Sequence, residues 1–399
     1  MSSSDQVRKI LEQCFPNADT FRITENPTNG KHHNVISNVI NLTIEYQEDG
    51  VENKKFLVLK IPKSSDATSY FDELAFYSRE AFMYDVVIPR INSYLDTSIT
   101  PVCFKTIDSR IIILENLTFL DYEKGGNYRL HLKQCLPIVK ALAHFHASSH
   151  KVCQMDPHLL DKEILQYSAV LEWRQRIATF WEPILVELLA RNNKSYLIPK
   201  FKNICLYLKR EDTDVKSRIH YSNFKFLVLN HGDFHSDNVL LKYGSNDSVE
   251  VKIIDFQASF WSTPICDFMN FFFLGAEADL IENHFETLLD WYLHCLNEKL
   301  KTNNCFKEYR KQDFLEDIQT LNFCSVLYAM CLSFILYPLD RVPLADVIFH
   351  KQTENIQYYI DVCLNDKIFS SHVLNCLKLC ERLGLLEPTQ SNSPLSDSQ

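Results

Sequence analysis

The chain has 399 residues, of which 46% are hydrophobic and 12% aromatic, so it is long enough for two lobes and can bury a sizeable core. Its formal net charge of −10 argues against nucleic acid as a partner. The 13 cysteines form no CxxC pair, and residues 1–10 hold no apolar stretch long enough for a signal peptide. This usage is typical of reduced, buried thiols, so we expect a cytoplasmic protein.

The first hundred or so residues predict a small β-rich lobe. Residues 38–46 form a β-branched run, residues 47–50 a turn and residues 55–61 a second strand, which indicates an antiparallel pair. Residues 68–82 have a helical pattern, and residues 110–114 form another strand. A polar stretch then runs to Gly126. We therefore expect an N-terminal lobe over residues 1–117 with a hinge at about 114–118.

Beyond the hinge the chain is mostly helical in pattern, which predicts a second lobe over residues 118–387. Residues 130–149 keep a helical period despite Pro137, and segments after residue 159, around 280–300 and after 352 are similar. The most apolar region, 321–337, carries Asn322 and Ser325 and falls short of a membrane span, so we expect a buried helix. Residues 388–399 are rich in Ser, Pro, Asn and Gln, a composition typical of disorder.

The most specific pattern of the chain is His231-Gly-Asp-Phe-His-Ser-Asp-Asn238 followed by Val251–Phe256. Residues 238–243 and 249–254 predict two strands with turn residues between them, so a hairpin would return Asp255 to the neighbourhood of Asn238. An aspartate, an asparagine five residues later and an aspartate after the next strand are the layout of phosphoryl transfer in kinase-type folds. Asp233 would then orient or deprotonate an acceptor hydroxyl, while Asn238 and Asp255 would bind Mg²⁺ through oxygen atoms.

Two other metal sites are compatible with parts of the sequence. Residues 232–235 also resemble a fragment of a dinuclear metallophosphatase site, but such a site needs further His and Asp clusters, and none follows downstream. His146 and His150 stand at i, i+4 spacing on one helical face, but their segment offers no third ligand. Packing or hydrogen bonding is the favoured role of these two histidines.

Nucleotide binding in a kinase-type fold needs a strand lysine that reaches the phosphates and a helix glutamate that pairs with this lysine. Lys60, at the end of its strand, is the candidate lysine, and Glu73, in the helical segment that follows, is the candidate acid.

The other nucleotide contacts are predicted from position. Residues 29–37 stand where a loop would cover the phosphates, and Gly30 is their one glycine, which leaves Asn34 and Ser37 as polar contacts. The segment from Glu115 to Leu117 stands where the hinge would pass the adenine, with contacts made by its backbone.

These residues resemble the ecdysteroid kinase-like family, also called CHK kinase-like, which is related to aminoglycoside phosphotransferases and choline kinases. The resemblance runs from about residue 30 to residue 384, and its most specific pieces are Leu229–Asp233 with Asn238, Ile253–Gln257, Pro264–Phe268, Leu114–Leu117 and Leu142–Ser148. It implies an α+β, two-lobed, protein-kinase-like fold, with one regulatory-type helix in the small β-rich lobe and a large, mostly helical C-terminal lobe. It also implies ATP and Mg²⁺ as cofactors, the site residues named above in their stated roles, and Asp267 as a structural acid near the catalytic loop.

Two positions depart from the family pattern. His32 stands where a second glycine is expected in the phosphate loop, which bears on nucleotide affinity. His235 stands where the family tends to have tryptophan, which bears on the choice of acceptor.

The acceptor is expected to be a small hydroxylated molecule, with no nucleic acid, membrane or obligate protein partner. Only residues 258–266 separate Gln257 from Asp267, which leaves little room for a peptide platform. Gln257 is neutral where choline kinases favour an acid, which argues against a quaternary ammonium acceptor. The aromatic residues Trp261, Phe271 and Phe272 suit either an apolar pocket, as for a steroid, or the core.

Two functions stay open at this point. The first is an ATP-dependent kinase for an ecdysteroid-like or other hydroxylated metabolite or xenobiotic. The second, motivated by the glycine-poor phosphate loop, is a catalytically weak or inactive binding protein on the same fold.

Overall fold

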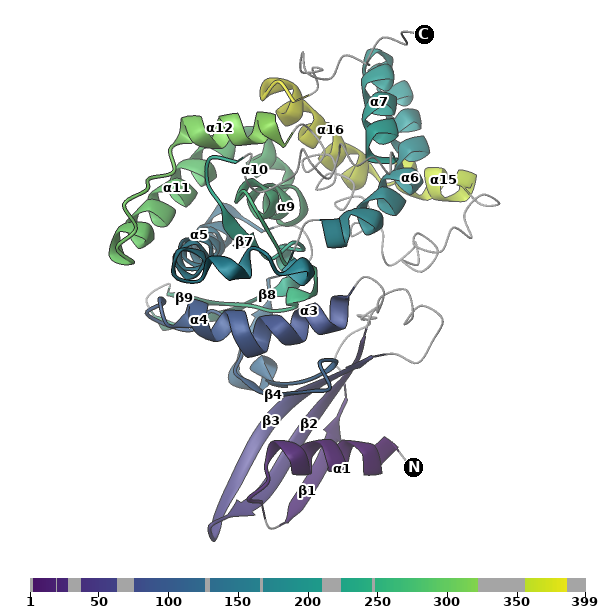
Figure 1. Ribbon diagram of the computed structural model, residues 1–399. Helices are drawn as coiled ribbons and strands as arrows, with labels where there is room; N and C mark the ends of the chain where they lie inside the picture. Colours follow the sequence, from purple (N-terminus) through teal and green to yellow (C-terminus); the bar gives the residue numbers. More distant parts are fainter. Residues whose placement is uncertain are drawn as a thin grey trace, which may run out of the picture. The chain divides into compact units, whose positions relative to one another are not determined.

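The structure, a computed structural model, describes residues 3–18, 20–27, 37–62, 75–125, 130–165, 168–209, 224–245, 248–321 and 356–385 (Figure 1). Contacts divide the chain into two compact units, and each is described by itself. Unit 1 comprises Met1–Lys124 and Val239–Ser259, and unit 2 comprises Gly125–Asn238 and Phe260–Gln399. The hairpin that was expected within the C-terminal lobe thus groups with the N-terminal residues, and the division does not follow a single boundary near residue 117.

Unit 1 is built on a five-stranded antiparallel sheet in the order β1-β2-β3-β5-β4. Its strands are β1 (Phe21–Asn26), β2 (Ser37–Glu48), β3 (Val51–Pro62), β4 (Cys103–Ile107) and β5 (Ile111–Glu115). Asp49 and Gly50 connect β2 to β3 with φ angles of 52° and 75°. Positive φ at both central residues is what a two-residue type I′ hairpin requires, and Asp-Gly supplies it at low cost. The predicted antiparallel pair and the predicted strand at 110–114 are confirmed.

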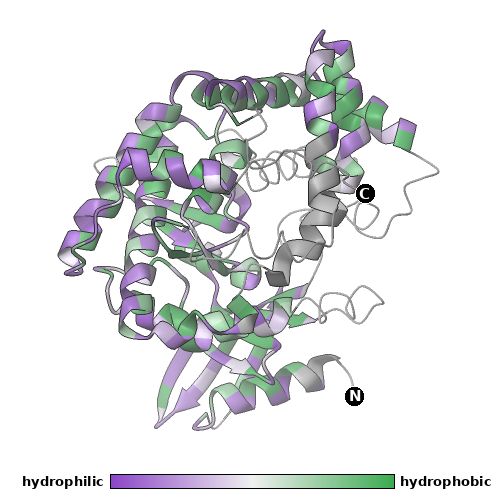
Figure 2. Ribbon diagram, turned by 45° about the horizontal axis from the view of Figure 1, so that its top comes forward, coloured by the Kyte–Doolittle hydropathy of each residue, from purple (hydrophilic) through white to green (hydrophobic). Residues whose placement is uncertain are grey.

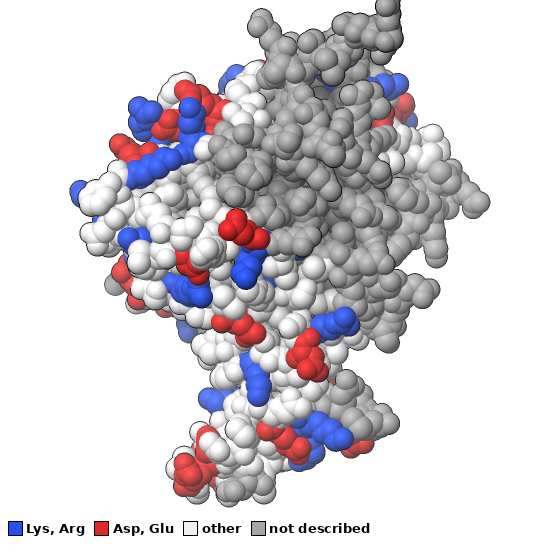
Figure 3. Space-filling model, in the orientation of Figure 1, with Lys and Arg blue, Asp and Glu red and all other residues white. Residues whose placement is uncertain are grey.

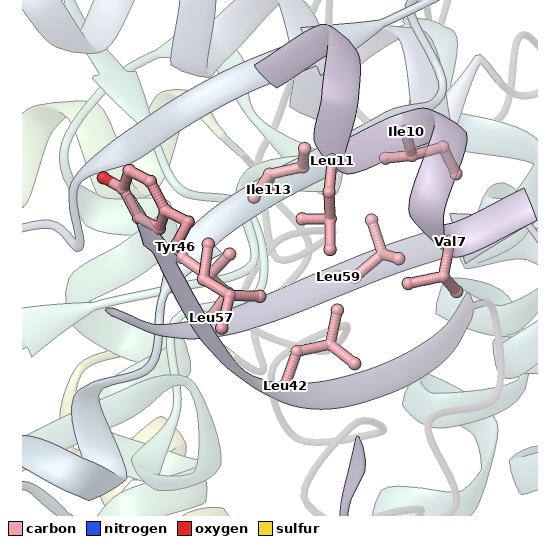
Figure 4. Packing of buried hydrophobic residues seen from close by; sticks show 9 residues of the cluster. Val7, Ile10, Leu11, Leu42, Tyr46, Leu57, Leu59 and Ile113 are labelled. Carbon is pink, nitrogen blue, oxygen red and sulfur yellow. The ribbon is translucent and has the colours of Figure 1, made fainter. Parts of the chain in front are cut away.

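Helix α1 (Ser3–Cys14) packs on this sheet and was not predicted. Val7, Ile10 and Leu11 follow the i, i+3, i+4 spacing of one helical face and are buried (Figure 4). They form one core cluster with strand residues that include Leu57 and Leu59. Burial of this short apolar stripe is what fixes the helix against the sheet.

A continuous helical stretch follows the gap at residues 63–74. It consists of α3 (Phe76–Phe82), the π-helical segment η1 (Met83–Val87) and α4 (Ile88–Asn92). The predicted helix at 68–82 therefore continues ten residues further than expected, while its residues before Ala75 lie outside the described part of the chain.

A second, three-stranded sheet of unit 1 has the order β6-β8-β9. It contains β6 (Glu123–Lys124) and the hairpin of β8 (Val239–Tyr243) and β9 (Val249–Ile253), in which Val239 pairs with Ile253. The predicted hairpin is confirmed. The 3₁₀ turns η2 (Leu117–Leu120) and η9 (Phe256–Ala258) complete the unit.

Unit 2 is mostly helical, as predicted. Its described helices are α5 (Leu132–Met155), α6 (Ser168–Arg191), α7 (Ile198–Lys209), α9 (Ile265–Gly275), α10 (Ala278–Asn283), α11 (Phe285–Thr302), α12 (Lys311–Thr320), α15 (Ile356–Asn365) and α16 (Lys367–Arg382). Its described strands are β7 (Val228–Asn230) and β10 (Phe260–Ser262), which pair antiparallel. Short 3₁₀ turns are η3 (Pro157–Leu159), η4 (Glu163–Leu165), η5 (Ser195–Leu197) and η7 (Ser236–Asn238).

Helix α9 lies at the centre of unit 2, because all of its residues are buried. Other helices carry both hydrophobic and hydrophilic residues, as an amphipathic helix does when one face packs and the other meets water (Figure 2). The α+β class, with a β-rich N-terminal part and a mostly helical C-terminal part, is thereby confirmed.

Surface and hydropathy give two further observations. On the face drawn in Figure 3, acidic and basic side chains are interspersed among the coloured residues. Among the helices that the structure describes, none is both long and apolar enough to cross a membrane. The predicted apolar helix at 321–337 and the tail at 388–399 fall, except for Leu321, outside the described residues.

Candidate active site

In unit 1, three charged side chains from three elements meet; we call them the lysine cluster. Lys60 of β3 places its Nζ 2.7 Å from both carboxylate oxygens of Glu80 of α3. The same Nζ lies 2.9 Å from Oδ1 of Asp255, which follows β9. The exposed fractions of the side chains of Lys60, Glu80 and Asp255 are only 9%, 3% and 18%. The lysine is therefore a buried cation that donates to two carboxylates.

Glu80 is a site residue that the sequence interpretation missed. The predicted partner of Lys60, Glu73, lies outside the described residues, and the structure pairs Lys60 with the glutamate seven positions later. A signal was present in the sequence, because Arg79 and Glu80 are the two charged residues of the otherwise uncharged, mostly apolar run from Phe76 to Met83. Buried charges need partners, so such a pair in an apolar helix indicates a tertiary ion pair.

The electrostatics of the cluster keep Lys60 protonated. Burial lowers the pKa of Lys60, but the carboxylates of Asp255 and Glu80 outweigh this and raise it above its ordinary value. Burial raises the pKa of Glu80, and the ammonium group of Lys60 opposes that shift. The cluster thus presents a fixed positive charge beside two oxygen-bearing side chains.

Asp255 has an unusual backbone conformation, with φ 72° and ψ 61°. This left-handed region costs a non-glycine residue about 1–2 kcal/mol, although aspartate tolerates it better than most residues. Neighbouring contacts hold the segment: the buried guanidinium of Arg79 donates to the carbonyl of Gln257 at 2.7 Å, and the ring of Phe256 lies edge-on to Tyr84. The helical stretch that supplies Glu80 therefore also holds the backbone that follows Asp255.

The structure describes only some of the other residues that are predicted to contact the nucleotide. Gly30 and Asn34 lie outside the described residues, and Ser37 is the first residue of β2, where it is buried opposite Pro62. Glu115 ends β5 opposite Leu57 of β3, and Leu117 begins η2 and is buried. The hinge segment between them is anchored to β3, because the N–H of Asn116 donates to the carbonyl of Phe56 at 2.9 Å.

In unit 2, the residues 231–238 form a compact turn that we call the aspartate loop. The side-chain amide of Asn238 donates to the backbone carbonyl of Asp233 at 2.8 Å and approaches its carboxylate oxygen Oδ2 at 3.3 Å. Since the nitrogen of the Asn238 amide is committed to Asp233, its oxygen Oδ1 is the atom that this side chain can offer to a cation. The role of Asn238 as a metal ligand stays a prediction.

Asp267 anchors the aspartate loop from α9. Its carboxylate accepts the backbone N–H of His231 at 2.5 Å and that of Gly232 at 2.9 Å. Gly232 has φ 84°, a conformation that favours glycine. The structural role that the family resemblance implied for Asp267 is confirmed.

His146 of α5 completes the anchor. Its Nε2 lies 3.2 Å from Asp267 Oδ2 and its Nδ1 lies 2.7 Å from the hydroxyl of Tyr292 on α11. All three side chains are buried. His150, in contrast, bonds the carbonyl of Leu227 at 2.8 Å. The hydrogen-bonding role predicted for both histidines is confirmed.

Asp233 is held as a carboxylate. Burial raises its pKa, but His235, His231 and the Asn238 amide outweigh burial, so the net pKa lies below the ordinary value. Its side chain keeps 28% exposure. An ionised, partly exposed carboxylate can accept a proton or a hydrogen bond from a hydroxyl group.

The aromatic residues proposed to suit either a pocket or the core belong to the core. Trp261, Phe271 and Phe272 are each 1% exposed, and the indole N–H of Trp261 donates to the carbonyl of Leu159 at 3.1 Å. They do not identify the class of acceptor.

The chain is similar to one protein family and to several solved structures. The model of the family described as ecdysteroid kinase-like matches residues 31–305. Among solved structures, an ethanolamine kinase of Plasmodium vivax is 13% identical, with 90% of this chain and 83% of that chain covered and a TM-score of 0.38. The GDP complex of wild-type aminoglycoside 2′-phosphotransferase-IIIa is 14% identical, with coverages of 96% and 98% and a TM-score of 0.43. An amicoumacin kinase in complex with AMP-PNP, Ca²⁺ and Ami is 14% identical, with coverages of 94% and 100% and a TM-score of 0.36. No curated protein matches the chain.

Proposed function

This chain belongs to the ecdysteroid kinase-like family of small-molecule kinases, and we propose that it transfers the γ-phosphoryl group of Mg-ATP to a hydroxyl group of a small organic acceptor. The observation that carries the proposal is the lysine cluster, in which buried Lys60 donates to Glu80 and to Asp255. A cation fixed between a helix acid and a strand-end aspartate suits the binding of a nucleotide's phosphates. The proposed acceptors are ecdysteroid-like compounds and other hydroxylated metabolites or xenobiotics.

Nucleotide binding is assigned to unit 1 in this proposal. Lys60 contacts the phosphates, and Glu80 holds the lysine in place. Backbone groups of Glu115 and Leu117 contact the adenine. Gly30, Asn34 and Ser37 of the predicted phosphate loop are proposed to contact the phosphates.

Magnesium is assigned to Asn238 and Asp255. Both side chains offer the oxygen donors that a hard cation prefers. Bound Mg²⁺ would neutralise negative charge on the phosphates. Asn238 fits this role because its amide nitrogen is already bonded to Asp233.

The proposed chemistry centres on Asp233. The carboxylate accepts the proton of the acceptor hydroxyl while the hydroxyl oxygen forms a bond to the γ-phosphorus. The bond between the γ-phosphorus and the oxygen that bridges it to the β-phosphorus breaks, and ADP leaves with the electron pair. The products are the phosphorylated acceptor and ADP, and Asp233 afterwards releases its proton to solvent.

The test uses the intact protein with labelled ATP, Mg²⁺ and a panel of hydroxylated metabolites that includes ecdysteroids. An untargeted mass-spectrometric screen should find an acceptor that gains one phosphoryl group, and Asp233→Asn should abolish this product while it still binds Mg-ATP. Asp237→Asn makes the same charge change in the same loop and should retain activity. Mg-ATP binding without any turnover would select the alternative, a catalytically inactive binding protein, and absence of ATP binding would contradict both.

A further inference from the structure

Asn116 is a buried side chain at the centre of the hinge segment, residues 115–117, and its hydrogen bonds fix its orientation. It is 2% exposed, and its Oδ1 accepts the backbone N–H of Thr118 at 3.2 Å and also the hydroxyl of Thr118. A backbone N–H can only donate, so the atom that meets it must be the amide oxygen. The amide nitrogen is therefore the atom that meets Asn41 of β2, to whose Oδ1 it donates at 3.1 Å.

The backbone of Asn116 is held as well. Its N–H donates to the carbonyl of Phe56 on β3 at 2.9 Å, and its carbonyl accepts the N–H of Phe119 at 3.3 Å. The side chain and the backbone of this one residue thus tie the hinge segment to β2, to β3 and to the turn η2. These bonds fix the register of the segment relative to the sheet.

The two neighbours of Asn116 present different backbone groups. In an antiparallel ladder, neighbouring residues of a strand bond to opposite sides, so Glu115 bonds away from β3, and its N–H donates to the carbonyl of Val102 at 2.8 Å. The carbonyl of Leu117 accepts the N–H of Tyr122 at 3.1 Å. Among the described residues, neither the C=O of Glu115 nor the N–H of Leu117 takes part in the loop and turn bonds of this segment.

An acceptor followed by a donor matches adenine, which offers a donor at its exocyclic N6 and an acceptor at the adjacent ring nitrogen N1. Guanine offers the acceptor O6 and the donor N1–H at the same two places. Guanine would therefore set acceptor against acceptor at Glu115 and donor against donor at Leu117. The hinge segment would have to shift before an N–H could reach O6.

We propose that Asn116 determines nucleotide specificity: by pinning the hinge segment to β2 and to η2, it prevents this shift and selects adenine over guanine. The inference rests on the proposed function, since it concerns the nucleotide of the same site. It does not require turnover, because the choice between the two bases is made in binding.

The test measures binding of Mg-AMP-PNP and Mg-GMP-PNP to the intact protein by calorimetry. The wild type should prefer AMP-PNP by about a hundredfold, because each unmatched buried polar contact costs about tenfold and guanine makes two. Asn116→Ala should raise the Kd for AMP-PNP about tenfold and leave the Kd for GMP-PNP unchanged or lower, so that the preference falls to about tenfold or less. Asn116→Asp keeps the oxygen that accepts from Thr118, and the amide of Asn41 can turn to donate to it. This variant should keep the preference within about threefold of the wild type.

Two further variants separate the role in specificity from a loss of stability. Asn41→Ala removes only the partner of the Asn116 amide nitrogen and should lower the preference by about threefold to tenfold. Asn26→Ala is the matched control, because Asn26 donates to the hydroxyl of Thr43 at 2.8 Å, joins β1 to β2 and makes no bond to the hinge segment. It should keep the preference of the wild type, even where its melting temperature falls as far as that of Asn41→Ala.

An unchanged ratio of the two dissociation constants in Asn116→Ala, including an equal weakening of both nucleotides, would overturn the inference, since Asn116 would then only stabilise the fold. If Asn116→Ala does not fold, the ratio in Asn41→Ala decides in the same way. Equal affinity of the wild type for both nucleotides would overturn the inference and leave the kinase proposal standing. Absence of binding of either nucleotide to the wild type would overturn both.

Discussion

Replacing Glu80 by glutamine tests the lysine cluster most directly. The substitution keeps the shape of the side chain but removes the charge that lies 2.7 Å from Lys60 through both oxygens. In the variant, the Lys60 ammonium keeps one charged partner, Asp255, at 2.9 Å. The lysine should then pair with the aspartate that is proposed to bind Mg²⁺.

The expected loss in the free energy of unfolding follows from the burial of the Lys60–Glu80 ion pair. Removing one partner of a buried ion pair costs about 3–5 kcal/mol, mainly because the other charge is stranded. Here Lys60 is not stranded, because Asp255 remains and the glutamine oxygen still accepts one hydrogen bond. We therefore expect Glu80→Gln to lower the free energy of unfolding by about 2 kcal/mol, at the lower end of the effects that unpaired buried groups produce. The Mg²⁺ concentration for half-maximal ATP turnover should rise, and kcat should fall by about tenfold.

The assays are urea unfolding and steady-state ADP release titrated with Mg²⁺ and ATP. Glu73→Gln is the matched comparison, since the sequence alone assigned this role to Glu73. If Glu73→Gln affects Mg²⁺ dependence more than Glu80→Gln does, or if Glu80→Gln leaves stability and kinetics unchanged, the assignment of Glu80 as the partner of Lys60 in the working protein is refuted.

Three further predictions concern stability. His372 of α16 lies 2.6 Å from the carbonyl of Phe273, and burial lowers its pKa to about 4. The pKa of a histidine in the unfolded chain is about 6.5, so the unfolded chain binds more protons than the folded one between pH 6.5 and 4. The free energy of unfolding should therefore fall by about 3 kcal/mol as the pH is lowered across this window. Urea titrations at several pH values should show a smaller loss for His372→Gln. Leu11→Ala removes a side chain with no exposed surface and should lower the free energy of unfolding by about 3 kcal/mol, whereas a loss under 1 kcal/mol would show that α1 does not contribute to the core. Asp267→Asn places an amide NH₂ group, which is a donor, against the backbone N–H donors of the aspartate loop. It should lower the free energy of unfolding by about 2 kcal/mol and also reduce kcat. Full activity of this variant would contradict the anchoring role.

Much of unit 1 could be predicted because its signals are local. Strand β2 alternates polar and apolar residues from Asn41 to Gln47, and strand β3 contains the apolar run Phe56–Leu59. Asp49-Gly50 joins them, and its conformational preference fixes the turn. The hairpin of β8 and β9 could be predicted from two β-branched or apolar runs separated by the turn residues 244–248. Helix α1 was missed because its apolar stripe has only three residues, and β1 was missed because it is short and mostly polar.

The site was predicted where residues stand close in sequence and missed where a contact depends on tertiary packing. The motif from Asp233 to Asn238 lies in one turn, so its spacing is visible in the sequence. The pairing of Lys60 with Glu80 spans 20 residues and depends on where the helix passes the strand. The bond between His146 and Asp267 spans 121 residues and joins two helices, which no periodicity reveals.

The π-helical segment η1 has a consequence for insertions and deletions. It lies between α3, which carries Arg79 and Glu80, and α4, which buries Ile88 and Ile91. A π segment holds one residue more than a regular helical turn, and each residue of a helix advances the facing direction by about 100°. Loss of a single residue from this segment would therefore restore a regular helix and swing Glu80 about a quarter turn away relative to the hydrophobic anchor of α4. The length of this stretch is thus expected to be as strictly maintained as the identity of the acid itself.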